Sequence, residues 1–138
     1  MIGPRRKARE YALQMLFQCE FHGQSGESFS SEDFFADRKE NKEQKQFAEE
    51  LVKGTLDNIE MIDSVIQKAA ENWDLMRMAA VDRNILRSAV FEILSRKDIP
   101  SAVTINEALE IAKKYSSLES VSFINGLLDK IARDRGKT

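Results

Sequence analysis

Apolar residues recur at helical spacing along nearly the whole chain. The first segment, PRRKAREYALQMLFQCEF from Pro4 to Phe21, opens on a proline, which suits a first helical position because its missing N–H is no loss there. Its apolar side chains then follow at offsets of four, seven, eight and eleven: Ala8, Ala12, Met15, Leu16 and Cys19. One apolar stripe on one helix is the structure that this spacing predicts.

Six further helices are predicted after the first one. A short helix follows Ser30 and runs to about Arg38, and two helices from about Asn41 meet near Asn58. Gly54 lies inside this stretch, where glycine costs up to about 1 kcal/mol against alanine. That cost suggests close contact with a neighbouring helix, although a tolerated surface glycine fits the sequence nearly as well.

The widest apolar stripe lies between residues 81 and 97 and predicts a central core helix. Asp98-Ile99-Pro100 ends it, and Thr104-Ile105-Asn106-Glu107 has the form of a capping box that begins the next helix. Ser116-Ser117 separates that helix from a last one. The sequence therefore predicts an all-α fold of about seven helices in two small packed bundles, approximately residues 1–57 and 58–138, forming one domain.

Composition removes several classes of function. The longest apolar runs are too short to span a membrane and no leader peptide is visible, so we expect a soluble cytoplasmic protein. The single cysteine, Cys19, lies on the apolar stripe and is expected in the core. His22 has no partner at metal-ligand spacing, and no phosphate loop or nucleophile with a base occurs. We expect no enzyme activity, no metal site and no cofactor.

Charge is distributed unevenly, although the net charge is only −2. Arg5, Arg6, Lys7 and Arg9 crowd the start of the first helix, where the helix dipole is already positive, whereas residues 10–60 carry five bases against twelve acids. Arg5 and Arg9 share a helix face at i, i+4. Contact with a polyanion would explain this cluster, and a solvated chain end is the alternative. Any nucleic-acid site must therefore be confined to one end of the molecule, since the chain as a whole is not basic.

Phe123 offers a second candidate contact, because it lies at the edge of the last apolar stripe. A phenylalanine in that position is either partly buried core or an exposed ring on which a base can stack.

Five spaced motifs in the chain resemble the NusB family of transcription antitermination factors. They are RRKAREYALQMLFQ from Arg5, the region of Gly54 with Ile62-Asp63, DRNILRSAVFEIL from Asp82, DIPSAVTINEALEIAKKYS from Asp98 and FINGLLDKIA from Phe123. The resemblance covers most of the chain and weakens between about Gly23 and Lys45. It implies an all-helical domain of two bundles, in agreement with the helix count.

The resemblance also implies function and partners. Such proteins bind the boxA segment of nascent single-stranded RNA together with NusE, a small-subunit ribosomal protein. The pair joins other Nus factors on RNA polymerase and favours read-through in ribosomal RNA operons. Carried onto this sequence, the RNA contacts are Arg5, Arg6, Lys7, Arg9, Phe17 and Phe123, and the residue in the NusE-binding region is Asp82.

Two positions depart from the family pattern. Phe17 stands where tyrosine is frequent, so a phenolic hydrogen bond is lost, and Val121-Ser122 replaces a frequent basic residue before Phe123. Two other functions stay open: a protein-only helical adaptor, and an appendage of an RNA methyltransferase. The sequence also leaves homodimerisation open.

Overall fold

The computed structural model describes residues 3–21, 30–36, 38 and 40–136. Those residues form seven α-helices, one 3₁₀-helix and no strand, which confirms the all-α prediction. The elements are α1 (Pro4–Phe21), α2 (Ser31–Phe35), α3 (Lys42–Asp57), α4 (Ile59–Ala69), η1 (Leu75–Arg77), α5 (Ala80–Ser95), α6 (Ser101–Tyr115) and α7 (Leu118–Asp134). His22 lies outside the described residues.

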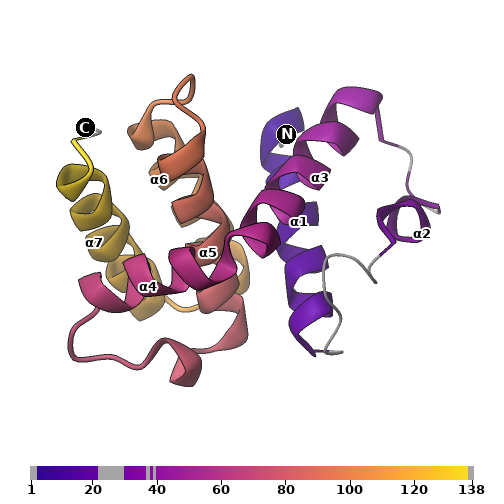
Figure 1. The fold of residues 1–138 in the computed structure, drawn as a ribbon. Coiled ribbons are helices and arrows are strands. Elements are labelled where there is room, and N and C mark those ends of the chain that lie inside the picture. The colour runs from indigo at the N-terminus through magenta and orange to yellow at the C-terminus, as the bar shows by residue number, and fades with distance from the viewer. Residues whose placement is uncertain (1–2, 22–29, 37, 39, 137–138) are drawn as a thin grey trace.

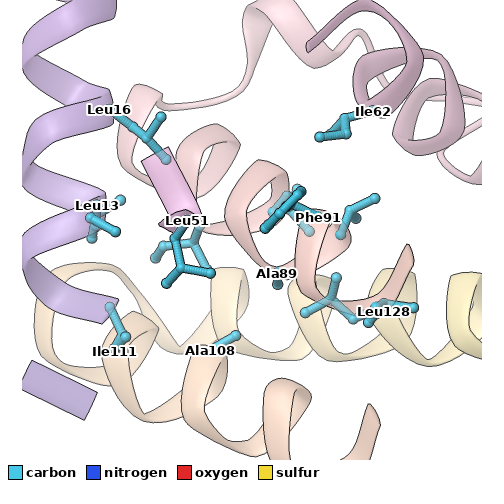
Figure 2. Packing of buried hydrophobic residues seen from close by; sticks show 14 of the residues in the cluster. Leu13, Leu16, Leu51, Ile62, Ala89, Phe91, Ala108, Ile111 and Leu128 are labelled. Carbon is cyan, nitrogen blue, oxygen red and sulfur yellow. The ribbon is translucent and has the colours of Figure 1, made fainter. Parts of the chain in front are cut away.

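Helix α5 is the centre of the fold, as its wide apolar stripe predicted. Every residue from Asp82 to Ile93 is buried, and α5 contacts α1, α3, α4, α6 and α7. Figure 1 shows α1, α2 and α3 to one side of α5 and α4, α6 and α7 to the other. In Figure 2, Leu13 and Leu16 of α1 point toward Leu51 of α3, while Phe91 of α5 lies farther along the same core. Helices from both parts of the chain therefore share one apolar core.

Gly54 is a close-contact glycine. A Cβ atom there would lie 2.1 Å from Cζ of Phe91, whose ring is buried on α5. Because real Cβ atoms do not approach that closely, α3 and α5 can cross at this distance only with glycine at position 54. Asn58 then ends α3, and its side-chain amide donates to the Gly54 carbonyl at 2.8 Å. The two helices meet at Asn58 as predicted.

Two predicted helix boundaries are wrong. The short helix ends at Phe35 and does not reach Arg38. The predicted capping box at Thr104 does not exist, because α6 begins earlier, at Ser101, with Pro100 as its N-cap. Proline fixes a backbone angle that suits a helix start, so the helix has already passed its first turn at Thr104. Both side chains of the supposed box, Thr104 and Glu107, are used for contacts with other helices.

Candidate nucleic-acid interface

The four cations at the start of α1 have different surroundings. Arg5 is exposed, and its guanidinium carbon lies 4.5 Å from the centroid of the Phe47 ring. Lys7 is half-buried, with its ammonium 5.1 Å from the Tyr11 ring centroid. Among the described residues, neither cation forms an ion pair. Cations resting on aromatic faces keep their N–H groups available to an anion.

Arg6 is engaged with a carboxylate from another helix. Its Nε donates to Oε1 of Glu107 at 3.0 Å and its Nη2 donates to Oε2 at 2.6 Å. This paired geometry raises the pKa of Arg6, and the hydrogen bonds from Arg6 lower the pKa of Glu107. The pair links the first turn of α1 to α6.

Arg9 is buried, with 6% of its surface exposed, and forms a fork with Glu92 of α5. Its Nε and Nη2 donate to the two carboxylate oxygens at 2.9 and 2.8 Å, and the hydroxyl of Thr104 donates to Glu92 at 3.2 Å. Arg9 therefore has no free N–H fork for a phosphate in this structure. One signal in the sequence could have indicated this pairing: Glu92 is an acid beside the apolar stripe of the predicted central core helix, and a buried acid requires a cation.

Cations from other parts of the chain join Arg5 and Lys7. The guanidinium of Arg38 lies 5.8 Å from the Tyr11 centroid, and that of Arg96 lies 5.5 Å from the Phe47 centroid. Arg96 also donates to carboxylates on both sides, so it is largely neutralised. Neither arginine could be assigned to this end of α1 from the sequence, because each is far from α1 along the chain. We call the part of the molecule around the start of α1 that carries Arg5 on Phe47, and Lys7 and Arg38 on Tyr11, the cationic face.

A groove beside Arg5 is lined by residues from the start of α1 and from the first turns of α3. Its volume is about 330 Å³, and Arg5, Gln44, Gln46 and Phe47 are among its lining residues. The amide of Gln44 donates to the Pro4 carbonyl at 3.2 Å, which holds the two helix starts together. Glu43, Glu50 and Arg96 line the groove as well, so it carries charges of both signs beside Arg5.

Phe17 lies far from the cationic face. It is twelve residues beyond Arg5 on α1, which corresponds to about 18 Å along the helix axis. Its ring is 37% exposed and stacks on Phe21, with centroids 6.0 Å apart. Near this end of α1, Glu20 accepts from Arg83 at 2.7 Å and from Asn84 at 2.6 Å. Phe17 is therefore associated with the start of α5, away from the cluster of cations.

Phe123 and Asp82, which are far apart in the sequence, line one surface hollow. The hollow has a volume of about 720 Å³ and also includes Trp73. Phe123 is half-buried against the core and meets Trp73 edge-on, with centroids 5.4 Å apart, and Trp73 is 60% exposed. The hollow thus combines aromatic rings with polar groups.

Asp82 is buried in the first turn of α5 and does not project into solvent as a free charge. Its two carboxylate oxygens accept hydrogen bonds from Ser116 at 2.6 Å and from Ser120 at 2.7 Å. It therefore holds the connection between α6 and α7 against α5.

Other site types find no support in the described residues. No group of three or more His, Cys, Asp or Glu side chains there could hold a metal ion. Cys19 is buried, and burial raises the pKa of its thiol, as expected for a core residue. No helix in the described part of the chain is long and apolar enough to cross a bilayer.

Comparison with known proteins gives consistent similarities. The model of the NusB family matches residues 6–133. A transcription antitermination protein NusB from Desulfitobacterium hafniense is 54% identical, over 96% of this chain and 90% of its own. The solved structure of T. maritima NusB is 41% identical, with a TM-score of 0.83 over 97% of this chain and 94% of that one. A crystal structure of the antitermination factors NusB and NusE in complex with dsRNA is 30% identical, with a TM-score of 0.84 over 97% and 99%.

Proposed function

Because this chain belongs to the NusB family, we propose that it acts in the cytoplasm as an RNA-binding transcription antitermination factor. With NusE it binds the boxA segment of nascent RNA. The pair joins other Nus factors on RNA polymerase and favours read-through in ribosomal RNA operons. The solved NusB–NusE complex with dsRNA supports this proposal, since this chain matches it over nearly its full length. The protein binds its partners and catalyses no reaction.

The observation that carries the proposal is the unpaired state of Arg5 and Lys7 on the cationic face. Both side chains rest on aromatic rings, and neither has a carboxylate partner among the described residues. An RNA strand that reaches either side chain gains a cation near the positive end of α1 without breaking an ion pair of the described residues.

The other predicted RNA residues receive different roles in this proposal. Arg9, held by Glu92, positions the start of α1 on α5. Phe123, supported edge-on by Trp73, supplies a face on which a base stacks. Phe17, at the far end of α1, belongs to the region that meets the protein partner.

NusE docks, in this proposal, beside the hollow at the start of α5. Asp82 acts there by holding Ser116 and Ser120, which shape the connection between α6 and α7. The two bundles, approximately residues 1–57 and 58–138, act as one domain because α5 packs against helices of both. RNA and NusE can then be bound by one rigid body.

Titration of boxA-like RNA tests the cationic face. With about 0.7 unit of log–log salt slope per phosphate contact on a single strand, replacing Arg5 and Lys7 by alanine should flatten the slope by about 1.4. Lys53→Ala is the matched control, because Lys53 lies away from the cationic face on α3, is 79% exposed and pairs with Asp57 of the same helix. An unchanged slope in the double variant, measured with NusE present, would place the RNA elsewhere.

A second measurement tests the partner face. Asp82→Asn keeps the side-chain shape but removes the charge that binds the two serine hydroxyls, so it should weaken the affinity for NusE. Asp129→Asn, at an exposed position on α7, is the control. If Asp82→Asn binds NusE as tightly as the unmodified protein does, the proposed docking face is wrong.

The protein-only adaptor is the alternative that these titrations also decide. A protein-only adaptor binds NusE but does not bind RNA, whether NusE is present or absent. The methyltransferase appendage is disfavoured, since the matched relative is an antitermination protein of which this chain covers 90%.

A further inference from the structure

Glu107 of α6 lies near two arginines of α1, Arg6 and Arg9, and of these Arg9 also pairs with a second carboxylate, that of Glu92. Arg6 forms both of its short hydrogen bonds with Glu107, at 3.0 and 2.6 Å. Arg9 directs its fork at Glu92, while its remaining nitrogen, Nη1, lies 3.8 Å from Oε1 of Glu107. Glu107 therefore has a second cation within reach if Arg6 leaves.

The two arginine pairs differ in burial. The side chains of Arg9 and Glu92 are 6% and 2% exposed, whereas those of Arg6 and Glu107 are 30% and 16% exposed. An ion pair that water reaches contributes little net stability, while a buried pair is costly to open. Of the two, the Arg6 pair is the one that can open while the protein stays folded.

A phosphate can replace Glu107 at Arg6. A guanidinium fork recognises a carboxylate and a phosphate in the same bidentate manner, with two parallel N–H···O bonds. Arg6 also lies directly between Arg5 and Lys7 in the sequence, on the first turns of α1. Because 30% of the Arg6 side chain is exposed, a phosphate of an RNA strand bound at the start of α1 can reach its guanidinium.

We propose that Glu107 acts as a positioning residue that holds Arg6 ready and yields it to an RNA phosphate, with Arg9 remaining as the partner of Glu107. This inference rests on the proposed RNA binding. The exchange makes Arg6 a third phosphate contact in the complex. Glu107 also lowers the affinity for RNA, because its hydrogen bonds with Arg6 must be broken each time RNA binds.

A double-mutant cycle on RNA affinity tests the exchange, with NusE present and salt fixed. Glu107→Gln keeps the side-chain shape but removes the charge, and should tighten RNA binding by about two- to fivefold, the value of a partly exposed pair. Arg6→Gln should weaken binding and flatten the salt slope by about 0.7. In the double variant, the gain from Glu107→Gln should disappear.

Glu110→Gln controls for the general loss of negative charge. Glu110 lies on α6 close enough to raise the pKa of Arg6 through space, but it forms its ion pair with Lys113. The exchange is overturned if Glu107→Gln raises RNA affinity no more than Glu110→Gln does. It is also overturned if the rise caused by Glu107→Gln persists in the Arg6→Gln background. Unchanged affinity in Glu107→Gln overturns it as well.

Arginine side-chain NMR gives a readout that needs no variant. The Nε–H signal of Arg6 should shift when RNA is added, whereas that of Arg9 should stay in place. An Arg6 signal that does not respond to bound RNA refutes the exchange while leaving RNA binding intact. If the unmodified protein with NusE binds no RNA at all, the proposed function fails and this inference fails with it.

Discussion

Replacing Arg9 by alanine should destabilise the fold strongly, even though Arg9 belongs to the arginine cluster that the sequence assigns to RNA. The substitution leaves the Glu92 carboxylate buried, with only the hydroxyl of Thr104 as a hydrogen-bond donor at 3.2 Å. Removing one partner of a buried pair costs about 3–5 kcal/mol. The contact of Arg9 with the Phe47 ring, at 5.2 Å from its centroid, adds about 0.5–1 kcal/mol.

This loss is a large part of the stability of a small domain, which is typically about 5–15 kcal/mol. Urea unfolding at pH 7, followed by circular dichroism, should show a midpoint shifted to much lower denaturant with an unchanged m-value. Arg9→Met combined with Glu92→Leu removes both charges and keeps apolar volume, so the double variant should lose less than Arg9→Ala does.

The opposite pattern would refute the structural role of Arg9. Suppose that the unfolding free energy of Arg9→Ala lies within about 1 kcal/mol of that of the unmodified protein, while its salt-dependent RNA affinity is lost. Arg9 would then contact phosphate directly. A double variant less stable than the single one would show that the unpaired charge of Glu92 is not what destabilises Arg9→Ala. RNA affinity must be measured under conditions in which the variant is folded.

Three further predictions concern packing, stacking and acid stability. Gly54→Ala should lower the unfolding free energy by about 1–2 kcal/mol, because the new methyl group meets a buried ring on α5. Gly126→Ala is the control: it has open space around it on α7, so its unfolding free energy, measured by the same calorimetry, should rise by up to about 1 kcal/mol. Phe123→Ala should cost about 1–3 kcal/mol of RNA affinity, with a stability loss below the about 3–5 kcal/mol of a fully buried phenylalanine; a full stability loss with intact RNA binding contradicts stacking. Hydrogen bonds from Arg96 lower the pKa of Asp98 to about 2, so Asp98 contributes stability that is complete above its unfolded pKa of about 3.9 and is lost as the pH falls toward 2. Asp98→Asn should therefore flatten the decline of urea stability between pH 5 and 2, and an unaltered acid limb would show that this pair does not stabilise the fold.

The sequence alone determined the helices and the most buried one among them. Helical spacing is a local property, so the stripes of α1, α5 and α7 could be identified without knowledge of their neighbours. The concentration of cations at one end of α1 was equally visible.

The tertiary structure decided which of those cations are free. Arg6 and Arg9 look like Arg5 and Lys7 in the sequence, yet carboxylates 101 and 83 residues away hold them. A cation at a helix start has no local signal of its partner, because the partner depends on which face of another helix packs against it. The same reason explains the wrong capping box at Glu107, whose carboxylate is taken by Arg6 on α1. Packing between distant helices therefore divided one cluster of four cations into two that carboxylates hold and two that have no carboxylate partner among the described residues.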